Sequence, residues 1–381
     1  MCIRDRSQVA PHFATLVEGL EQLAKGLEDL SVVEAPELEG ARVRLLGIMR
    51  RLTEAHVQLG SLIAEPAENV IYWLETRNRY PLTLNAVPLH VGALIREHLF
   101  DKKRSVILTS ATLRVAGSFD YLRNRLGAES ADELAVGSPF DYQSAALLYI
   151  TTDVPEPRNP GHQQVLAQAL EALFKATEGR ALALFTSYSQ LKETANAITG
   201  KLAQEGITVY AQGGGSSRAQ LLENFRKGEK AVLLGTRSFW EGVDVPGEAL
   251  SCLVITKLPF DVPNDPIVAA RAEAYEDPFN EYMVPEAVLR FMQGFGRLIR
   301  TASDMGIAVV LDQRILTKRY GHRFLESLPD PLIRQGSYKD LPSIAARWLS
   351  GKPLPVTAFD PDLDEPWGVP PPEDPPWFWG A

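Results

Sequence analysis

Apolar residues recur at spacings of three and four along residues 8–64, as Leu16, Leu20 and Leu23 illustrate. This period is that of a helix, in which positions i, i+3 and i+4 lie on one face. Pro36 lies between two such stretches, so the pattern predicts a helical hairpin. An ordinary packed pair of helices explains this segment, and nothing in it carries chemistry.

From residue 69 the pattern changes to short apolar runs separated by segments of helical period. The runs are VIYWLE, LTLNAVPL, SVILTSATL, ALLYITT, ALALFTS, ITVYAQ, KAVLLGT, LSCLVITKL and IAVVLD. Helices are expected in HVGALIREHLF and over residues 162–177, 190–204, 218–227 and 286–300. Fully apolar strands that alternate with helices predict an α/β fold, with a parallel sheet covered by helices on both faces. The loops at the carboxyl ends of such strands are where chemistry is expected.

The last residues, 351–381, are rich in proline and acidic residues and show neither period, which predicts a disordered tail. Their aromatic side chains are Trp367, Trp377, Phe378 and Trp379, an unusual content for a purely solvating segment. Two interpretations stay open: a tail without a function of its own, and a docking peptide for a protein partner.

Composition narrows the class of protein. The length of 381 residues suits about two domains, and no apolar stretch is long enough to cross a bilayer. The start, MCIRDRSQVA, lacks the apolar core of a signal peptide, so a cytoplasmic location without a membrane partner is predicted. Cys2 and Cys252 are the only cysteines, too few for a disulfide framework or a four-thiolate metal site, and Cys252 is expected in the core. The net charge of -9 argues against indiscriminate coating of nucleic acid but leaves room for a locally basic groove.

Small polar residues follow the apolar run of residues 105–109, which we expect to be a buried strand. Ser110, Ala111 and Thr112 can bond neighbouring loops and pass on a conformational change without bulk. An ordinary strand end with a turn explains the same residues, because Ser and Thr favour such places.

Thr186 and Ser187 follow the run ALALF in the same way. Ser187 with Gln190 three residues later predicts a capping box that opens a helix. A helix start that exposes amides and hydroxyls can bind a phosphate, including one of a nucleic-acid backbone. A cap without any further function is the alternative.

The run KAVLLGT leads into a loop that holds Arg237, Ser238, Phe239, Trp240, Glu241, Gly242 and Asp244. We expect an exposed loop, and its crowd of aromatic, charged and glycine residues is difficult to explain by packing alone. For Trp240 the alternative is that its side chain anchors the loop in the core.

The segment QGFGRLIR places Gln293, Arg297 and Arg300 at positions i, i+4 and i+7, which share one face on a helix. Gly294 and Gly296 cost helix stability, so a long side chain or a ligand is expected to approach closely there.

Two guanidinium groups on one face stay charged at physiological pH and suit a phosphoryl group. Structural salt bridges, for instance to Asp304 or Asp312, explain the arginines of this segment equally well.

Taken together and in this order, the segments resemble the carboxyl-terminal half of superfamily two DNA helicases of the DinG and XPD type. TSATL resembles the third motif of that family, LFTSYSQL the fourth, GTRSFWEGVDVPG the fifth and QGFGRLIR the sixth. The resemblance covers roughly residues 69–330, and four motifs in the family's order are a specific signal. It implies a RecA-like fold.

The resemblance also implies roles. The residues implied at ATP are Gln293, Arg297, Arg300, Glu241, Gly242 and Asp244. The two arginines would stabilise the charge on the transferred phosphoryl group, and Glu241 would tie the fifth motif to the sixth. The residues implied at the phosphates of single-stranded DNA are Thr186, Ser187 and Ser238, and those implied to couple ATP hydrolysis to domain motion are Ser110, Ala111 and Thr112.

By the same resemblance the chain divides into four parts. Residues 1–64 would end an arch-like insertion, 65–135 would be the last part of the first RecA-like motor domain, 136–350 the second RecA-like domain, and 351–381 the tail. A helicase also needs a G-x-x-x-x-G-K-[ST] loop and an acidic box for magnesium, and neither occurs in this sequence. We therefore expect the later part of a longer protein, whose upstream part holds most ligands of ATP and Mg²⁺ and any iron-sulfur cluster.

The leading hypothesis is an ATP-dependent DNA helicase that moves five-prime to three-prime on single strands in DNA repair or replication, with this chain inactive alone. The alternative is a non-catalytic RecA-like module that binds nucleic acid or a partner.

Overall fold

The chain forms two compact units in a computed structural model that describes residues 15, 18–23, 25–26, 39–63, 67–76, 83–240 and 249–355. The first unit contains the described residues up to Arg104, with Arg125–Gly127 and Val262–Tyr275. The second contains Ser105–Asn124, Ala128–Asp261 and the described residues from Glu276 onward. The predicted tail lies outside the described residues from position 356 on, and the four predicted domain boundaries stay predictions.

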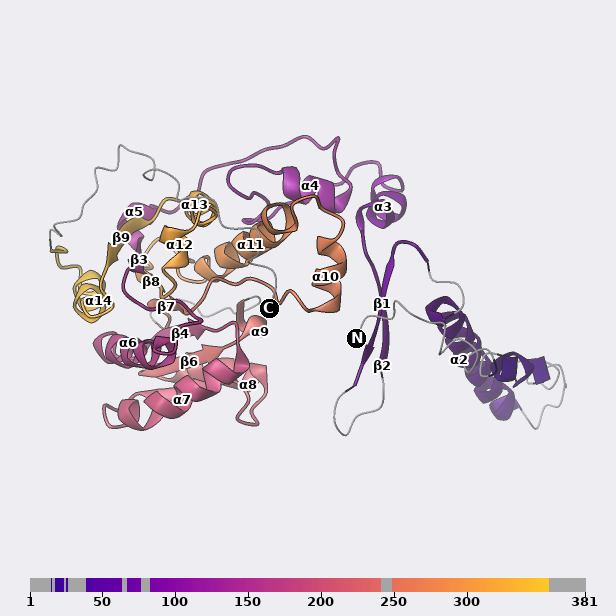
Figure 1. The fold of residues 1–381 in the computed structure, drawn as a ribbon, viewed down its shortest axis with the longest axis horizontal. Helices are drawn as coiled ribbons and strands as arrows, with labels where there is room; N and C mark the ends of the chain where they lie inside the picture. Colours follow the sequence, from indigo (N-terminus) through magenta and orange to yellow (C-terminus); the bar gives the residue numbers. More distant parts are fainter. Residues whose placement is uncertain are drawn as a thin grey trace. The chain divides into compact units, whose positions relative to one another are not determined.

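The first unit is helical at its start. Helix α2 spans Glu39–Ile63, and residues 18–23 and 25–26 are helical as well (Figure 1). Nε2 of His56 lies 3.3 Å from Oε1 of Glu21, so the two helical stretches meet. The remaining helices of the unit are α3, Gly92–Ile95, which continues as the π-helix η2, Arg96–Phe100, and α10, Pro266–Ala272.

Two strands of the first unit pair with each other alone. Strands β1, Val70–Glu75, and β2, Thr83–Pro88, are antiparallel, with Val70 opposite Pro88. The connection between them, residues 76–82, is too short in sequence for the crossover that parallel strands need. They depart from the parallel arrangement that the strand pattern predicts.

A seven-stranded sheet forms the centre of the second unit. Its order is β5-β6-β4-β7-β8-β3-β9, and every neighbouring pair is parallel. The strands are β3 Ala146–Thr151, β4 Ala181–Leu184, β5 Thr208–Ala211, β6 Ala231–Gly235, β7 Cys252–Ile255, β8 Gly306–Val310 and β9 Leu332–Gly336. The first six lie in predicted apolar runs, so the predicted parallel sheet is confirmed. The partly buried edge strand β9, LIRQG, was missed because its sequence has no continuous apolar run.

Helices cover both faces of this sheet, as predicted. They are α4 Asp120–Leu126, α5 Tyr142–Ala145, α6 His162–Ala176, α7 Tyr188–Ala203, α8 Arg218–Lys227, α9 Arg237–Trp240, the π-helix η4 Phe279–Met283, α11 Val284–Phe295, α12 Arg314–Thr317, α13 Gly321–Glu326 and α14 Leu341–Leu349. Leu148 packs with buried residues of α8, α11 and α13, whereas its neighbour Leu147 packs with α6, α7 and α14. Successive strand residues point to opposite faces, so one continuous apolar run supplies both cores.

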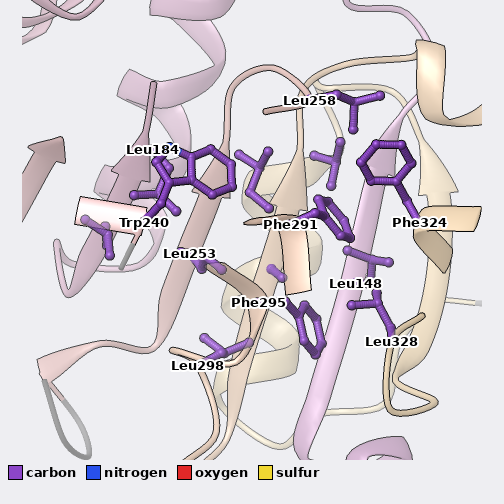
Figure 2. Close-up of a cluster of buried hydrophobic side chains, with 14 of the residues drawn as sticks. Leu148, Leu184, Trp240, Leu253, Leu258, Phe291, Phe295, Leu298, Phe324 and Leu328 are labelled. Carbon is purple, nitrogen blue, oxygen red and sulfur yellow. The ribbon is translucent and has the colours of Figure 1, made fainter. Parts of the chain in front are cut away.

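The core on the α11 face is rich in aromatic side chains. Trp240, Phe291, Phe295 and Phe324 are all buried there, in one cluster with Leu184 of β4 and Leu148 of β3 (Figure 2). Cys252 is fully buried in the opposite core, as predicted, and burial raises the pKa of its thiol. A thiol of this kind is an unreactive core residue.

The strand predicted over residues 105–109 is wrong. This segment has no strand structure, and the side chains of Ile107 and Leu108 are 89% and 46% exposed. A strand needs a neighbour for its backbone hydrogen bonds, and no strand of the described part of the chain pairs with this segment. Apolar composition alone therefore does not produce a buried strand here.

Two further searches covered the described residues only. No helix among them is long and apolar enough to cross a membrane. Within the same ranges, no group of three His, Cys, Asp or Glu side chains could hold a metal ion.

Candidate nucleotide and nucleic-acid interface

The loop after β4 begins helix α7 at the carboxyl edge of the sheet. Ser187 caps the helix, because its Oγ accepts the backbone N–H of Gln190 at 3.4 Å, and Thr186 is exposed beside it. The predicted capping box forms only in part. Oε1 of Gln190 is buried and accepts no hydrogen bond from any residue that the structure describes. The exposed start of a four-turn helix can nevertheless attract an anion.

A glutamine that sequence reasoning missed joins the next two strand ends. Oε1 of Gln212, just after β5, accepts hydrogen bonds from the backbone N–H and the hydroxyl of Thr236, both at 2.8 Å. Its Nε2 donates to Oγ of Ser238 at 3.3 Å. The exposed Ser238 therefore lies at the same carboxyl edge as Thr186 and Ser187, because parallel strands end together.

The aromatic residues of α9 are buried rather than exposed. Phe239 is 0% and Trp240 2% exposed, and the indole Nε1 of Trp240 donates to the carbonyl of Phe185 at 3.5 Å. The expectation of an exposed aromatic loop is wrong for these two residues, and the anchoring alternative for Trp240 is confirmed. Gly235 makes this possible, since a Cβ there would lie 2.5 Å from Cγ of Phe239.

Trp240 also explains the glycine in α11. A Cβ at Gly294 would lie 3.0 Å from Cε3 of the Trp240 ring, so the predicted close approach is made by a long side chain. Nη2 of Arg297 donates to the carbonyl oxygen of Trp240 at 3.2 Å. The segment that carries the candidate arginine fingers is therefore attached to α9.

The predicted helical face of Gln293, Arg297 and Arg300 is wrong. Helix α11 ends at Phe295, and the chain then tightens into turns in which the N–H of Arg297 bonds the carbonyl of Gly294 at 3.1 Å. The glycines lower the helix propensity here, which allows the early end. Only Gln293 is on the helix. Its Oε1 is buried and accepts no hydrogen bond within the described ranges, whereas both arginines are partly exposed.

Of the two acids considered as salt-bridge partners, Asp312 pairs with a different arginine, whereas Asp304 contacts Arg300 itself. The buried carboxylate of Asp312 accepts hydrogen bonds from Nε and Nη2 of Arg314, at 2.9 and 2.6 Å, and from the N–H of Leu258 at 2.9 Å. Oδ2 of Asp304 accepts the backbone N–H groups of Arg300 and Thr301, at 2.8 and 2.9 Å. Asp304 therefore fixes the backbone that follows the candidate fingers.

Asp304 gives a testable pH dependence. Burial raises the pKa of Asp304, but hydrogen bonds from Thr301 and Arg300 and the charge of Arg300 lower it more, so the pKa lies below its ordinary 3.8. A carboxyl group with a lower pKa in the folded state adds stability that is complete above the unfolded pKa and is lost as pH falls through the folded pKa. We expect Asp304→Asn to lower the free energy of unfolding at pH 7, and this effect should shrink progressively as the pH falls from about 4 through the folded pKa. Urea unfolding at pH 7 and at about pH 3 measures it, with the exposed Asp132→Asn as control. An equal loss at both pH values would contradict this assignment.

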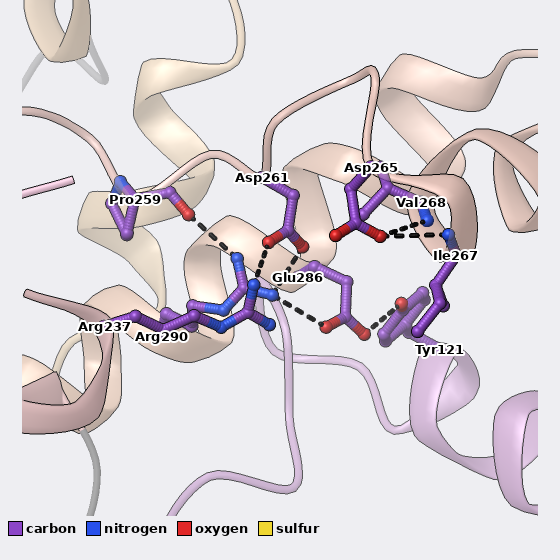
Figure 3. A network of polar contacts seen from close by, with 9 residues as sticks. All are labelled: Tyr121, Arg237, Pro259, Asp261, Asp265, Ile267, Val268, Glu286 and Arg290. Carbon is purple, nitrogen blue, oxygen red and sulfur yellow. Dashed lines mark hydrogen bonds and ion pairs between the residues drawn. The ribbon is translucent and has the colours of Figure 1, made fainter. Parts of the chain in front are cut away.

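A network of ionic side chains ties α9, the loop after β7 and α11 together (Figure 3). Oδ1 of Asp261 accepts Nη1 of Arg237 at 2.8 Å, and Oδ2 accepts Nη2 of Arg290 at 2.5 Å. Nη2 of Arg290 also lies 3.6 Å from Oε2 of Glu286, whose Oε1 accepts the hydroxyl of Tyr121 at 2.6 Å. Of these five residues, sequence reasoning named only Arg237, as a charged residue of the loop after KAVLLGT, and missed the other four. The charged Arg290 amid the apolar residues of VPEAVLRF was the one signal that could have revealed them.

Three candidates at ATP cannot be placed. Glu241, Gly242 and Asp244 lie outside the described residues, between Trp240 and Ala249. The candidate coupling residues can be placed. Ser110 and Ala111 are exposed, Thr112 is partly buried, and the Ser110 and Thr112 hydroxyls lie 3.3 Å apart. The backbone N–H of Thr112 also donates to Oγ of Ser110, at 3.2 Å.

Comparison with known proteins fits this geometry. Residues 170–331, which run from α6 to the start of β9, match the helicase C-terminal domain family. The chain is 40% identical to the ATP-dependent DNA helicase YoaA of Escherichia coli over 262 residues, which cover 68% of this chain and 40% of that protein. Residues 170–331 therefore form a helicase C-terminal domain.

Other relatives of this helicase domain agree. The chain is 33% identical to the 3'-5' exonuclease DinG of Bacillus subtilis over 340 residues, which cover 86% of the chain and 36% of that protein. The chain thus spans less than half the length of these two curated relatives. The solved structure of an XPD helicase superimposes with a TM-score of 0.54 and 19% identity, over 80% of this chain and 56% of that one. At this identity the superposition supports the RecA-like helicase fold alone.

Proposed function

We propose that this chain is the carboxyl-terminal part of an ATP-dependent DNA helicase that moves five-prime to three-prime on single-stranded DNA in repair or replication. The helicase C-terminal domain and the relatives' names support this proposal. The single observation that carries it is the hydrogen bond from Arg297 to the Trp240 carbonyl. Next to this bond, Gly294 leaves room for the Trp240 ring because glycine has no Cβ. This contact joins the candidate phosphoryl-binding segment to α9. Ser238 of α9 lies at the carboxyl edge of the sheet, where single-stranded DNA is proposed to bind.

The residues of the finger segment suit ATP. Oε1 of Gln293 is a buried acceptor with no hydrogen bond from another described residue, and two guanidinium groups follow it in partly exposed turns. ATP with Mg²⁺ supplies the phosphoryl group when bound. In this proposal Arg297 and Arg300 stabilise its developing charge, and Gln293 orients groups beside it. Glu241, Gly242 and Asp244 would complete this side of the nucleotide.

The carboxyl edge of the sheet offers suitable contacts for the phosphate backbone of single-stranded DNA. Thr186, Ser187 and Ser238 offer hydroxyls at the carboxyl edge, and the start of α7 adds backbone amides. Contacts of this kind hold any sequence, which a translocating motor requires. Ser110, Ala111 and Thr112 are proposed to couple ATP hydrolysis to movement, and the exposure of Ser110 and Ala111 makes them accessible to a neighbouring domain.

Single-strand binding by the chain itself tests the proposal. We expect a fluorescent oligothymidine to bind with an affinity that falls linearly on a log-log plot against salt, with a slope of about -0.7 for each phosphate neutralised. Fluorescence anisotropy at several salt concentrations measures this slope, with a duplex of equal length for comparison. If the chain does not bind single-stranded DNA, the DNA contacts proposed for Thr186, Ser187 and Ser238 are wrong. DNA-stimulated ATP hydrolysis by this chain alone would contradict the inference that the phosphate-binding loop is supplied from elsewhere.

A further inference from the structure

Asp261 divides one carboxylate between two arginines of very different exposure. Its side chain is 7% exposed, that of Arg290 is 10% exposed and that of Arg237 is 71% exposed. One oxygen faces each arginine, at 2.8 Å for Arg237 and 2.5 Å for Arg290 (Figure 3). The buried carboxylate of Asp261 therefore contacts one arginine in the interior of the unit and one at its surface.

The buried half of this arrangement is fixed by several contacts. Nη1 of Arg290 donates to the carbonyl of Pro259 at 3.1 Å, and its Nη2 approaches Glu286 on the same helix as well as Asp261. Removing one partner of a buried pair leaves an uncompensated charge, which costs several kcal/mol. Arg290 therefore keeps Asp261 close to α11.

The exposed half can exchange partners at little cost. Solvent already reaches most of the Arg237 side chain, and Arg290 continues to pair with Asp261 when Arg237 moves away. A phosphate offers a guanidinium group a comparable bidentate partner. Arg237 is also adjacent to Ser238, whose hydroxyl lies at the carboxyl edge of the sheet, among the residues proposed to bind DNA.

We propose that Arg237 is a further phosphate-binding residue for single-stranded DNA, and that Asp261 is a positioning residue which transmits this contact to α11. The inference rests on the proposed function, because it requires a bound strand. When Arg237 turns to a phosphate, Oδ1 of Asp261 loses its donor and the carboxylate is left to Arg290. Helix α11 carries Arg290 and Gln293 and leads directly into Arg297. The carboxylate of Asp261 thus transmits the binding of single-stranded DNA to the segment that holds the candidate arginine fingers.

The location of Asp261 in the chain supports a transmitting role. The chain leaves the second unit directly after Asp261 and returns to it at Glu276, shortly before α11 begins. Tyr121 on α4 extends the network, because its hydroxyl bonds Glu286. Three separate segments of the second unit thus meet at α11 through polar contacts.

The salt dependence of strand binding tests the phosphate contact. In the full chain, Arg237→Gln is expected to make the log-log slope shallower by about 0.7, the share of one phosphate on a single strand. Arg237→Lys should retain most of the slope, because it keeps the charge. The matched control is Lys201→Gln, which removes an exposed cation from the last turn of α7, away from the Ser187 cap. An unchanged slope for Arg237→Gln overturns the inference, while the wild-type binding result separately decides the proposed function.

Hydrogen exchange tests the transmission. Saturating oligothymidine is expected to change amide protection over residues 284–297 in the wild-type chain, and this change should disappear in Arg237→Gln and in Asp261→Asn. Arg237→Gln removes an exposed side chain and leaves Asp261 paired with Arg290, so it should fold normally and decides the result even where Asp261→Asn is destabilised. The same protection change in wild type and Arg237→Gln, measured at equal occupancy, overturns the positioning role of Asp261.

Discussion

Replacing Arg297 with alanine is expected to lower ATP turnover by about 10³- to 10⁵-fold in a protein that joins this chain to a phosphate-binding motor domain. An arginine finger acts on charge that develops in the transition state, so nucleotide affinity should change little. A loss of this size equals about 4–7 kcal/mol of transition-state stabilisation. The Arg297 bond to the Trp240 carbonyl is worth about 1 kcal/mol, so its loss alone cannot produce the expected effect.

Steady-state ATP hydrolysis with single-stranded DNA measures the turnover, and a fluorescent nucleotide analogue measures affinity. The control is Lys227→Ala, which removes an exposed cation from the last turn of α8. A turnover within tenfold of wild type would remove Arg297 from the catalytic role. A parallel loss of nucleotide affinity would instead assign Arg297 to ground-state binding.

Replacing Arg290 with methionine is expected to lower the free energy of unfolding by about 3–5 kcal/mol. Methionine fills much of the same space but leaves Asp261, only 7% exposed, without its buried partner. The Pro259 carbonyl also loses a donor. The same substitution at the exposed Arg237 should cost at most about 1 kcal/mol, because solvent reaches most of its side chain and Arg290 still pairs with Asp261.

Urea unfolding of both variants under one set of conditions measures this contrast. In thermal unfolding, a domain of this size should lose about 2–4 °C for each kcal/mol, so the midpoint of Arg290→Met should fall by about 6–20 °C. Equal effects of the two variants would mean that the burial of the Asp261 pair does not govern its energetics.

The strands of the second unit could be predicted because each is a continuous apolar run, as in ALLYIT of β3 and AVLLG of β6. Burial on both faces of a parallel sheet imposes this composition, so the sequence reveals it directly. The run at residues 105–109 has the same composition but no neighbouring strand in the described chain. Pairing partners are a property of the tertiary structure, and a single run cannot reveal them.

The candidate site was predictable in its residue types and less so in its geometry. The spacing of Gln293, Arg297 and Arg300 suggested one helical face, whereas the helix ends at Phe295. The residue that fills the space above Gly294 lies 54 positions away in the sequence, at Trp240 (294 - 240 = 54). The network of Asp261 joins residues from four segments, and contacts of this kind have no local sequence pattern.

Because the Trp240 ring packs against Gly294, substitutions at these two positions are expected to be coupled. A Cβ at residue 294 would lie 3.0 and 3.1 Å from two atoms of the indole ring, so even alanine there requires the ring to move. Related chains that carry a larger residue at the position of Gly294 should therefore carry a smaller one at the position of Trp240. An engineer who grafts either motif from a distant relative should transfer both together.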